Sequence, residues 1–134
     1  MIDIKIFDES NRKDIKGKVL DFYIPRFSNQ FSELTFNNSA VICLALEDDS
    51  RVVGAVRAIS DLTRHAMIVD LVVDANHRRQ GIGTKLLQAM VSELKRHNIK
   101  DIGLTTDPKT PWLPDFYLKN GFLAPDEGCV FLKI

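Results

Sequence analysis

Residues 72–87, VVDANHRRQGIGTKLL, decide the expected fold of this chain, because they join two apolar segments through a short polar turn. The first segment ends a strand-like run, and the second opens a series of apolar positions at helical spacing. The turn between them holds two adjacent arginines and two glycines. A strand that leads through such a turn into a helix is typical of a site that binds an anion.

The overall composition describes an ordinary globular protein. The chain has 134 residues, of which 45% are hydrophobic and 27% charged, so we expect one domain over residues 1–134. Lys and Arg balance Asp and Glu at 18 each, which predicts neither a nucleic-acid nor a membrane partner. No signal-peptide core and no apolar run of membrane-spanning length is present, so the expected location is the cytoplasm.

Cysteine and histidine give no sign of a metal or redox site. Cys43 and Cys129 lie far apart in apolar runs, and we expect buried reduced thiols. His65, His77 and His97 lack metal-ligand spacing, so we expect solvated or turn histidines and no bound metal. The basic residues 95–97 suit the C-terminal end of a helix.

The order of elements predicts a mixed sheet rather than a doubly wound nucleotide fold. Extended segments are expected at residues 2–7, 40–46, 51–59, 66–73, 102–105 and 129–134, and helices at 10–25, 27–34, 82–97 and 113–119. The second to fourth strands form a meander, and only the segments after it look like parallel crossovers. We therefore expect an α/β (α+β) fold with a mostly antiparallel central sheet of about six to seven strands, flanked by about four helices.

The glycine turn offers several groups to an anion. A helix that starts at a strand end presents unpaired backbone N–H groups and the positive end of its dipole. Gly81 and Gly83 lack Cβ atoms and let the backbone approach a phosphate closely. Arg78 and Arg79 add fixed charge, and Thr84 can add a hydroxyl. The spacing alone fits an ordinary helix start with solvated arginines equally well.

Two common phosphate motifs are excluded by the residues present. The dinucleotide fingerprint requires a third glycine at the position of Leu86. The P-loop requires lysine before serine or threonine, whereas Thr84 precedes Lys85 here.

Two motifs together resemble the GCN5-related N-acetyltransferase (GNAT) family. Residues 78–83, RRQGIG, match the Gln/Arg-x-x-Gly-x-Gly/Ala segment that cradles the pyrophosphate of acetyl coenzyme A in that family. Residues 115–122, DFYLKNGF, are close to its Phe-Tyr-x-x-x-Gly-Phe segment. The element order is also similar, although residues 107–112 lack an asparagine that contacts the cofactor in many members. The resemblance implies a GNAT-like fold, acetyl-CoA as cofactor and acetyl transfer to an amine.

The resemblance also implies a cofactor site made largely of backbone groups. Leu71 and Val73 would pair with the pantetheine arm like an added strand, and the Val73 N–H would polarise the thioester carbonyl. The full set of expected cofactor residues is Leu71, Val72, Val73, Arg78, Arg79, Gln80, Gly81, Ile82, Gly83, Thr84 and Phe116.

The chemistry requires an unprotonated amine and a protonated leaving thiolate. Tyr117 matches the family's tyrosine general acid. Asp70 is the candidate base, because it is the only ionisable side chain within residues 67–73. A satisfied polar residue at a sheet face or a bulge is an equal alternative, and if Asp70 points away, Glu33 or an ordered water chain is the fallback. The aromatic residues between 22 and 36 favour core packing over an acceptor pocket, whose mouth Trp112 would line.

The leading hypothesis is an acetyl-CoA-dependent N-acetyltransferase acting on a primary amine of a small molecule or a protein. A catalytically silent acyl-CoA-binding sensor or regulatory module is the alternative, and a nucleotide-phosphate enzyme is the third. We also consider a homodimer, formed if the last strand pairs at an exposed sheet edge.

Overall fold

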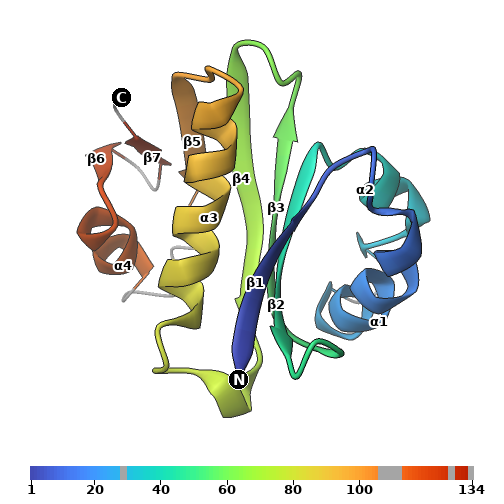
Figure 1. Ribbon diagram of the computed structural model, residues 1–134. Helices are drawn as coiled ribbons and strands as arrows, with labels where there is room; N and C mark the ends of the chain where they lie inside the picture. The colour runs from blue at the N-terminus through green and yellow to red at the C-terminus, as the bar shows by residue number, and fades with distance from the viewer. Residues whose placement is uncertain (28–29, 106–112, 127–128, 133–134) are drawn as a thin grey trace.

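The computed structural model describes residues 1–27, 30–105, 113–126 and 129–132, and it places all seven strands in one sheet (Figure 1). The elements in chain order are β1 (Ile2–Phe7), η1 (Lys13–Ile15), α1 (Lys16–Phe27), α2 (Glu33–Asn37), β2 (Val41–Glu47), β3 (Arg51–Ser60), β4 (His65–Val73), η3 (Ala75–His77), α3 (Ile82–Arg96), β5 (Asp101–Thr105), α4 (Leu113–Lys119), β6 (Phe122–Asp126) and β7 (Cys129–Leu132).

The strand order is β1-β2-β3-β4-β5-β7-β6, with one parallel pair, β4 and β5. The five other ladders of the described chain are antiparallel. Parallel neighbours need a crossover, and α3 supplies it between β4 and β5. The mixed, mostly antiparallel sheet with flanking helices is therefore confirmed.

Helices cover both faces of the sheet, with α1 and α2 on one side and α3 on the other (Figure 1). The apolar stripe expected on α3 is buried against the sheet through Leu86, Leu87, Met90 and Leu94. The core under α1 and α2 holds the aromatic side chains Phe22, Tyr23, Phe31 and Phe36. The preference for core packing of this aromatic cluster is confirmed.

Cys43 lies in β2, belongs to the core on the α3 side of the sheet and is fully buried. Burial raises the pKa of its thiol to about 12, so the thiol stays protonated at neutral pH. This confirms the expected buried thiol for Cys43; the side chain of Cys129 lies outside the described residues.

The C-terminal part of the sheet differs from the expectation. We predicted a single strand after α4, whereas the chain forms β6 and then β7. Pro125 weakens the strand signal of β6, and the sheet tolerates it because β6 is an edge strand. Because the chain reverses from β6 into β7, β7 runs antiparallel to β5, and the expected parallel crossover into the last strand is wrong. β7 has β5 on one side and β6 on the other, so the free edge expected for a dimer lies instead at β6 or β1.

The first long helix also differs, because α1 continues two residues past Pro25, where we expected it to end. Proline has no backbone N–H to donate, and its ring clashes with the preceding turn of a helix. Near the end of α1 only the last turn is affected, and burial of Phe22 and Tyr23 holds the helix on the sheet.

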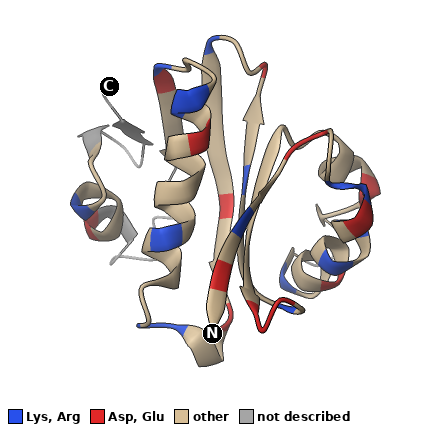
Figure 2. Cartoon of the chain, in the orientation of Figure 1, with Lys and Arg blue, Asp and Glu red and all other residues tan. Residues whose placement is uncertain are grey.

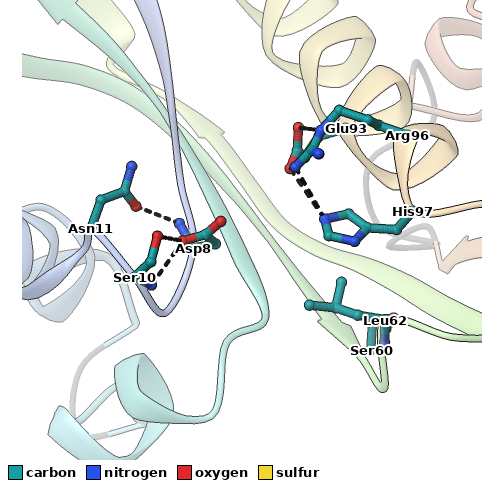
Figure 3. A network of polar contacts seen from close by, with 8 residues as sticks. All are labelled: Asp8, Ser10, Asn11, Ser60, Leu62, Glu93, Arg96 and His97. Atoms are coloured by element: carbon teal, nitrogen blue, oxygen red, sulfur yellow. Dashed lines mark hydrogen bonds and ion pairs between the residues drawn. The ribbon is translucent and has the colours of Figure 1, made fainter.

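The far end of α3 carries a charged cluster (Figure 3). Glu93 is 9% exposed, Arg96 donates to its Oε2 at 2.6 Å, and His97 Nε2 lies 3.3 Å from the same oxygen. The hydrogen bond from Arg96 is the main cause that lowers the pKa of Glu93. Basic residues thus end this helix at the negative end of its dipole, as predicted.

Candidate cofactor and catalytic site

The sheet opens between β4 and β5. The two strands pair from His65 opposite Asp101 to Ile68 opposite Leu104. β4 then continues to Val73, and in the described part of the chain residues 69–73 pair only with β3. One backbone edge of this segment is therefore available to an extended ligand that adds to the sheet as a strand would.

A β-bulge in β4 lies where the opening begins. Arg57 pairs with Val69 and Ala55 with Val72, so two residues of β4, Asp70 and Leu71, lie opposite one residue of β3. Asp70 has a φ of 56°, a left-handed conformation that costs a non-glycine residue about 1–3 kcal/mol. The bulge redirects the backbone of β4 at the start of its free edge.

Two side chains hold Asp70 in this conformation. The Tyr23 hydroxyl donates to the Asp70 carbonyl oxygen at 2.6 Å, and Arg57 Nε donates to Asp70 Oδ2 at 2.6 Å. Arg57 also donates to Ser39 Oγ at 3.3 Å and lies over the Phe31 ring, 5.6 Å from its centroid. Asp70 thus lies on the α1 and α2 face of the sheet, with one oxygen already engaged.

Sequence reasoning missed both of these partners. Arg57 had a usable signal, because it is the only charged residue in the apolar run 52–59, and a charge inside a sheet needs a partner. Tyr23 had no such signal, since the sequence predicts only a core residue and does not indicate what its hydroxyl binds.

The glycine turn lies at the end of the free edge. Basic residues occupy the segment between β4 and α3 (Figure 2), and Arg78, Arg79 and Gln80 are exposed. Arg79 and Gly81 have φ values of 65° and 75°, and such left-handed residues are common in turns that direct N–H groups at an anion. A Cβ atom on Gly81 would have open space around it, so glycine is required there by backbone conformation and not by crowding.

The first turn of α3 meets the end of β4 and α4. A Cβ atom on Gly83 would lie 3.4 Å from Phe116 Cζ and 3.8 Å from Val73 Cγ2. Thus Val73, Gly83 and Phe116, three of the residues expected at the cofactor, are brought together. Ile82 is 3% exposed and packs in the core, so only its backbone faces the turn. No side chain caps this helix start, although Thr84 is half-buried in its first turn.

Tyr117 lies in α4 and is 6% exposed. Its ring makes edge contacts with Phe116 and Phe122, with centroids 5.4 Å and 6.1 Å away. Burial raises the pKa of Tyr117 to about 12. The phenol is therefore protonated at neutral pH and able to act as a proton donor.

The other described residues singled out in the sequence lie away from the glycine turn or at its start. Glu33, the fallback base, starts α2, is exposed and pairs with Lys16 at 2.7 Å. His65 is exposed as expected, but His77 is not solvated: only 13% of its side chain is exposed. Trp112 and the segment 107–112 lie outside the described residues.

Within the described ranges, no three side chains of His, Cys, Asp or Glu are grouped as metal ligands would be. None of the described helices is both long enough and apolar enough to cross a bilayer.

A sheet edge that opens beside a positively charged glycine turn offers backbone hydrogen-bonding groups and positive charge to an extended ligand with an anionic end. The profile of the acetyltransferase (GNAT) family matches residues 9–122. The GCN5-related N-acetyltransferase 2, chloroplastic, of Arabidopsis thaliana is 34% identical over 82 residues, which are 61% of this chain and 31% of that protein. N-alpha-acetyltransferase 30 of Schizosaccharomyces pombe is 30% identical over 115 residues, 83% of this chain and 71% of that protein.

Solved structures have the same fold. A GNAT family acetyltransferase from Streptococcus pneumoniae aligns with a TM-score of 0.68 and 29% identity, covering 92% of this chain and 88% of that one. An aminoglycoside 6'-N-acetyltransferase complexed with coenzyme A aligns with a TM-score of 0.67 and 19% identity, over 96% and 94% of the two chains.

This chain therefore belongs to the acetyltransferase (GNAT) family, as its two motifs predicted. It spans about a third of the length of the plant relatives that it matches.

Proposed function

We propose that this chain is an acetyl-CoA-dependent N-acetyltransferase that transfers the acetyl group to a primary amine by direct attack. The free edge of β4 beside the glycine turn carries the proposal, because it matches a ligand with a strand-like arm and a phosphate end. Membership in the acetyltransferase family supports it independently.

The proposed cofactor site follows from these two features. The pantetheine arm pairs with the backbone of Leu71 and Val73, whereas Val72 between them pairs with Ala55 of β3 and packs its side chain in the core under α1 and α2. The pyrophosphate is bound by N–H groups of residues 81–83, with Arg78, Arg79, Gln80 and Thr84 around it. Phe116, which already packs against the Gly83 position, borders the arm.

The proposed reaction balances as follows. The amine nitrogen attacks the thioester carbon, the C–N bond forms, and the C–S bond breaks to release the CoA thiolate. Backbone N–H groups at residues 71–73 stabilise the oxyanion. Tyr117 gives its phenolic proton to the sulfur and regains one from solvent, while the proton lost by the amine passes to a base.

Asp70 is the proposed base, because its carboxylate lies at the start of the opening, on the face away from α3. Arg57 already donates to Oδ2, so this hydrogen bond fixes the position of the carboxylate. A water chain between the amine and Asp70 fits this arrangement better than Glu33, whose carboxylate is engaged by Lys16 at the surface.

The acceptor approaches, in this proposal, from the α1 and α2 face. A pocket of about 300 Å³ lies on α1 next to the end of β4. Its charged lining residues are Lys18, Asp21, Arg26, Arg51 and Asp74, and Arg26 is paired with Asp74, so the pocket does not favour a cationic amine. The relatives include an N-alpha-acetyltransferase and the solved neighbours an aminoglycoside acetyltransferase, so protein N-termini and aminoglycosides are candidate acceptors. The cytoplasmic location remains a prediction, since one relative is a chloroplastic protein.

The test is release of the CoA thiol from acetyl-CoA across a panel of peptide N-termini, lysine peptides, aminoglycosides, polyamines and arylalkylamines, with the Tyr117→Phe variant beside the native protein. We expect amine-dependent release that the variant loses, with acetyl-CoA binding little changed. Equal turnover of both proteins at every pH would remove Tyr117 from the mechanism. Binding of acetyl-CoA without release for any amine would instead support a silent sensor module.

A further inference from the structure

An ionic cluster lies at the start of the turn that is proposed to bind the cofactor phosphates. His77, the last residue of η3, has Nδ1 3.0 Å from Asp74 Oδ2 and Nε2 3.0 Å from Glu47 Oε2. Glu47 ends β2, and Asp74 follows β4 directly. The cluster therefore connects the start of the turn to the ends of β2 and β4.

The protonation state of His77 follows from these partners. Carboxylate oxygens of Glu47 and Asp74 only accept hydrogen bonds, so both ring nitrogens must donate, and only the imidazolium has two N–H groups. The hydrogen bond to Glu47, followed by that to Asp74, raises the pKa of His77 above its ordinary value of 6.5. The imidazolium is thereby favoured around neutral pH.

The surrounding positive charges come from α1, from β3 and from the turn itself. Arg26 of α1 lies 3.3 Å from Asp74 Oδ1. The hydrogen bond with His77 is the main cause that lowers the pKa of Asp74, and the charges of Arg26 and of Arg51 at the start of β3 add to it. Arg78 and Arg79 follow His77 in the turn itself. Within the Arg26, Asp74, His77 and Glu47 group the charges cancel while His77 is protonated.

We propose that His77 is a positioning residue whose imidazolium, held between Glu47 and Asp74, fixes the turn 78–83 for acetyl-CoA, so that protonation of His77 and binding of the cofactor phosphates strengthen each other. The inference rests on the proposed use of acetyl-CoA and adds a residue to its site.

Loss of the His77 proton acts on the turn in two ways. One ring nitrogen then turns a lone pair toward a carboxylate oxygen, which replaces a hydrogen bond by repulsion. The net charge of the cluster also becomes one unit more negative close to the proposed site of the cofactor phosphates. Both effects lower the affinity for phosphate, so affinity is retained below the raised pKa of His77 and falls as the pH increases through it.

The test is an NMR titration of the histidine ring protons between about pH 6 and about pH 9, with and without saturating acetyl-CoA. The variant His77→Gln assigns the His77 signal. By reciprocity, a ligand that prefers the imidazolium must raise the pKa of His77 when it binds. We expect a rise of about 0.5 to 0.7, which corresponds to roughly three- to fivefold weaker acetyl-CoA binding at high pH, as for a partly exposed ion pair.

Calorimetry gives the matching affinities. The dissociation constant of the native protein should increase over this pH range, whereas His77→Gln should bind more weakly at low pH and lose the pH dependence. Glu47→Gln should move the midpoint of the native profile to lower pH. The control is His65→Gln, an exposed histidine at the opposite end of β4, which should leave the profile unchanged.

The outcomes separate this inference from the proposed function. An unchanged pKa of His77 on binding, or a native pH profile retained in His77→Gln, would overturn the coupling while leaving acetyl-CoA as the cofactor. No binding of acetyl-CoA at any pH would refute the cofactor assignment, and this inference with it.

Discussion

Replacement of Tyr23 by phenylalanine should loosen the bulge of β4 without creating a cavity. The Tyr23 ring is fully buried, and its hydroxyl donates to the carbonyl oxygen of Asp70 at 2.6 Å. The variant keeps the ring and removes that donor alone. The carbonyl oxygen that loses its donor belongs to Asp70, whose backbone is already strained at a φ of 56°.

The magnitude follows from the lost hydrogen bond. Leaving a buried carbonyl without its partner costs about 1–3 kcal/mol, so we expect the free energy of unfolding to fall by about 2 kcal/mol. For a chain of this length the melting temperature should fall by roughly 6–10 °C. Because the free edge begins at the bulge, kcat/KM for acetyl-CoA should also fall, by about tenfold if the reacting groups move by a fraction of an ångström.

The assay is urea unfolding together with steady-state kinetics, and the chain provides its own matched control. The chain contains two tyrosines, and Tyr117→Phe makes the same chemical change at the other buried ring. Tyr23→Phe should lower stability and raise KM for acetyl-CoA, whereas Tyr117→Phe should mainly lower kcat. A Tyr23→Phe protein with native unfolding free energy and native KM would refute the claim that this hydroxyl holds the bulge.

Two further predictions concern α3. Gly81→Ala should lower the free energy of unfolding by about 1 kcal/mol, because alanine is strained at a φ of 75°, and it should weaken acetyl-CoA binding. Gly83→Ala should leave the free energy of unfolding unchanged or raise it by up to about 1 kcal/mol, since the added Cβ fits at 3.4 Å from Phe116. Urea unfolding and calorimetry rank the two, and the reverse order would contradict the assigned roles of these glycines. Glu93→Gln should lower the melting temperature near pH 7, and the difference from the native protein should vanish as the pH falls through the depressed pKa of Glu93, below its ordinary 4.5. A difference that does not shrink at all as the pH falls below 4.5 would show that the Glu93 charge is not its source.

Much of the candidate site was predictable because its signals are local. The glycine turn, the helix that follows it and the stripe of Leu86, Met90 and Leu94 are encoded in adjacent residues, and the structure places them as expected. The gathering of Val73, Gly83 and Phe116 was predictable only through the resemblance to a family, since Phe116 lies far along the chain.

Errors arose where local signals and tertiary context disagree. Pro25 and Pro125 both argue against the element they occupy, yet burial of neighbouring aromatics keeps α1 helical, and an edge position lets β6 accept proline. His77 looked like a solvated turn residue, because nothing in its neighbourhood indicates that Glu47, 30 residues earlier, lies 3.0 Å from its ring.

The sequence by itself determined most of the order of strands and helices, the positive glycine turn after the fourth strand, and the two motifs that resemble the acetyltransferase (GNAT) family. These features depend on residue type and short spacing, which dictate backbone conformation and local charge. Only the tertiary structure decided the free edge of β4, the left-handed Asp70 held by Tyr23 and Arg57, and the contact of His77 with Glu47. Each of these requires groups from separate elements to meet, and their meeting is set by strand register and core packing, which short stretches of sequence do not encode.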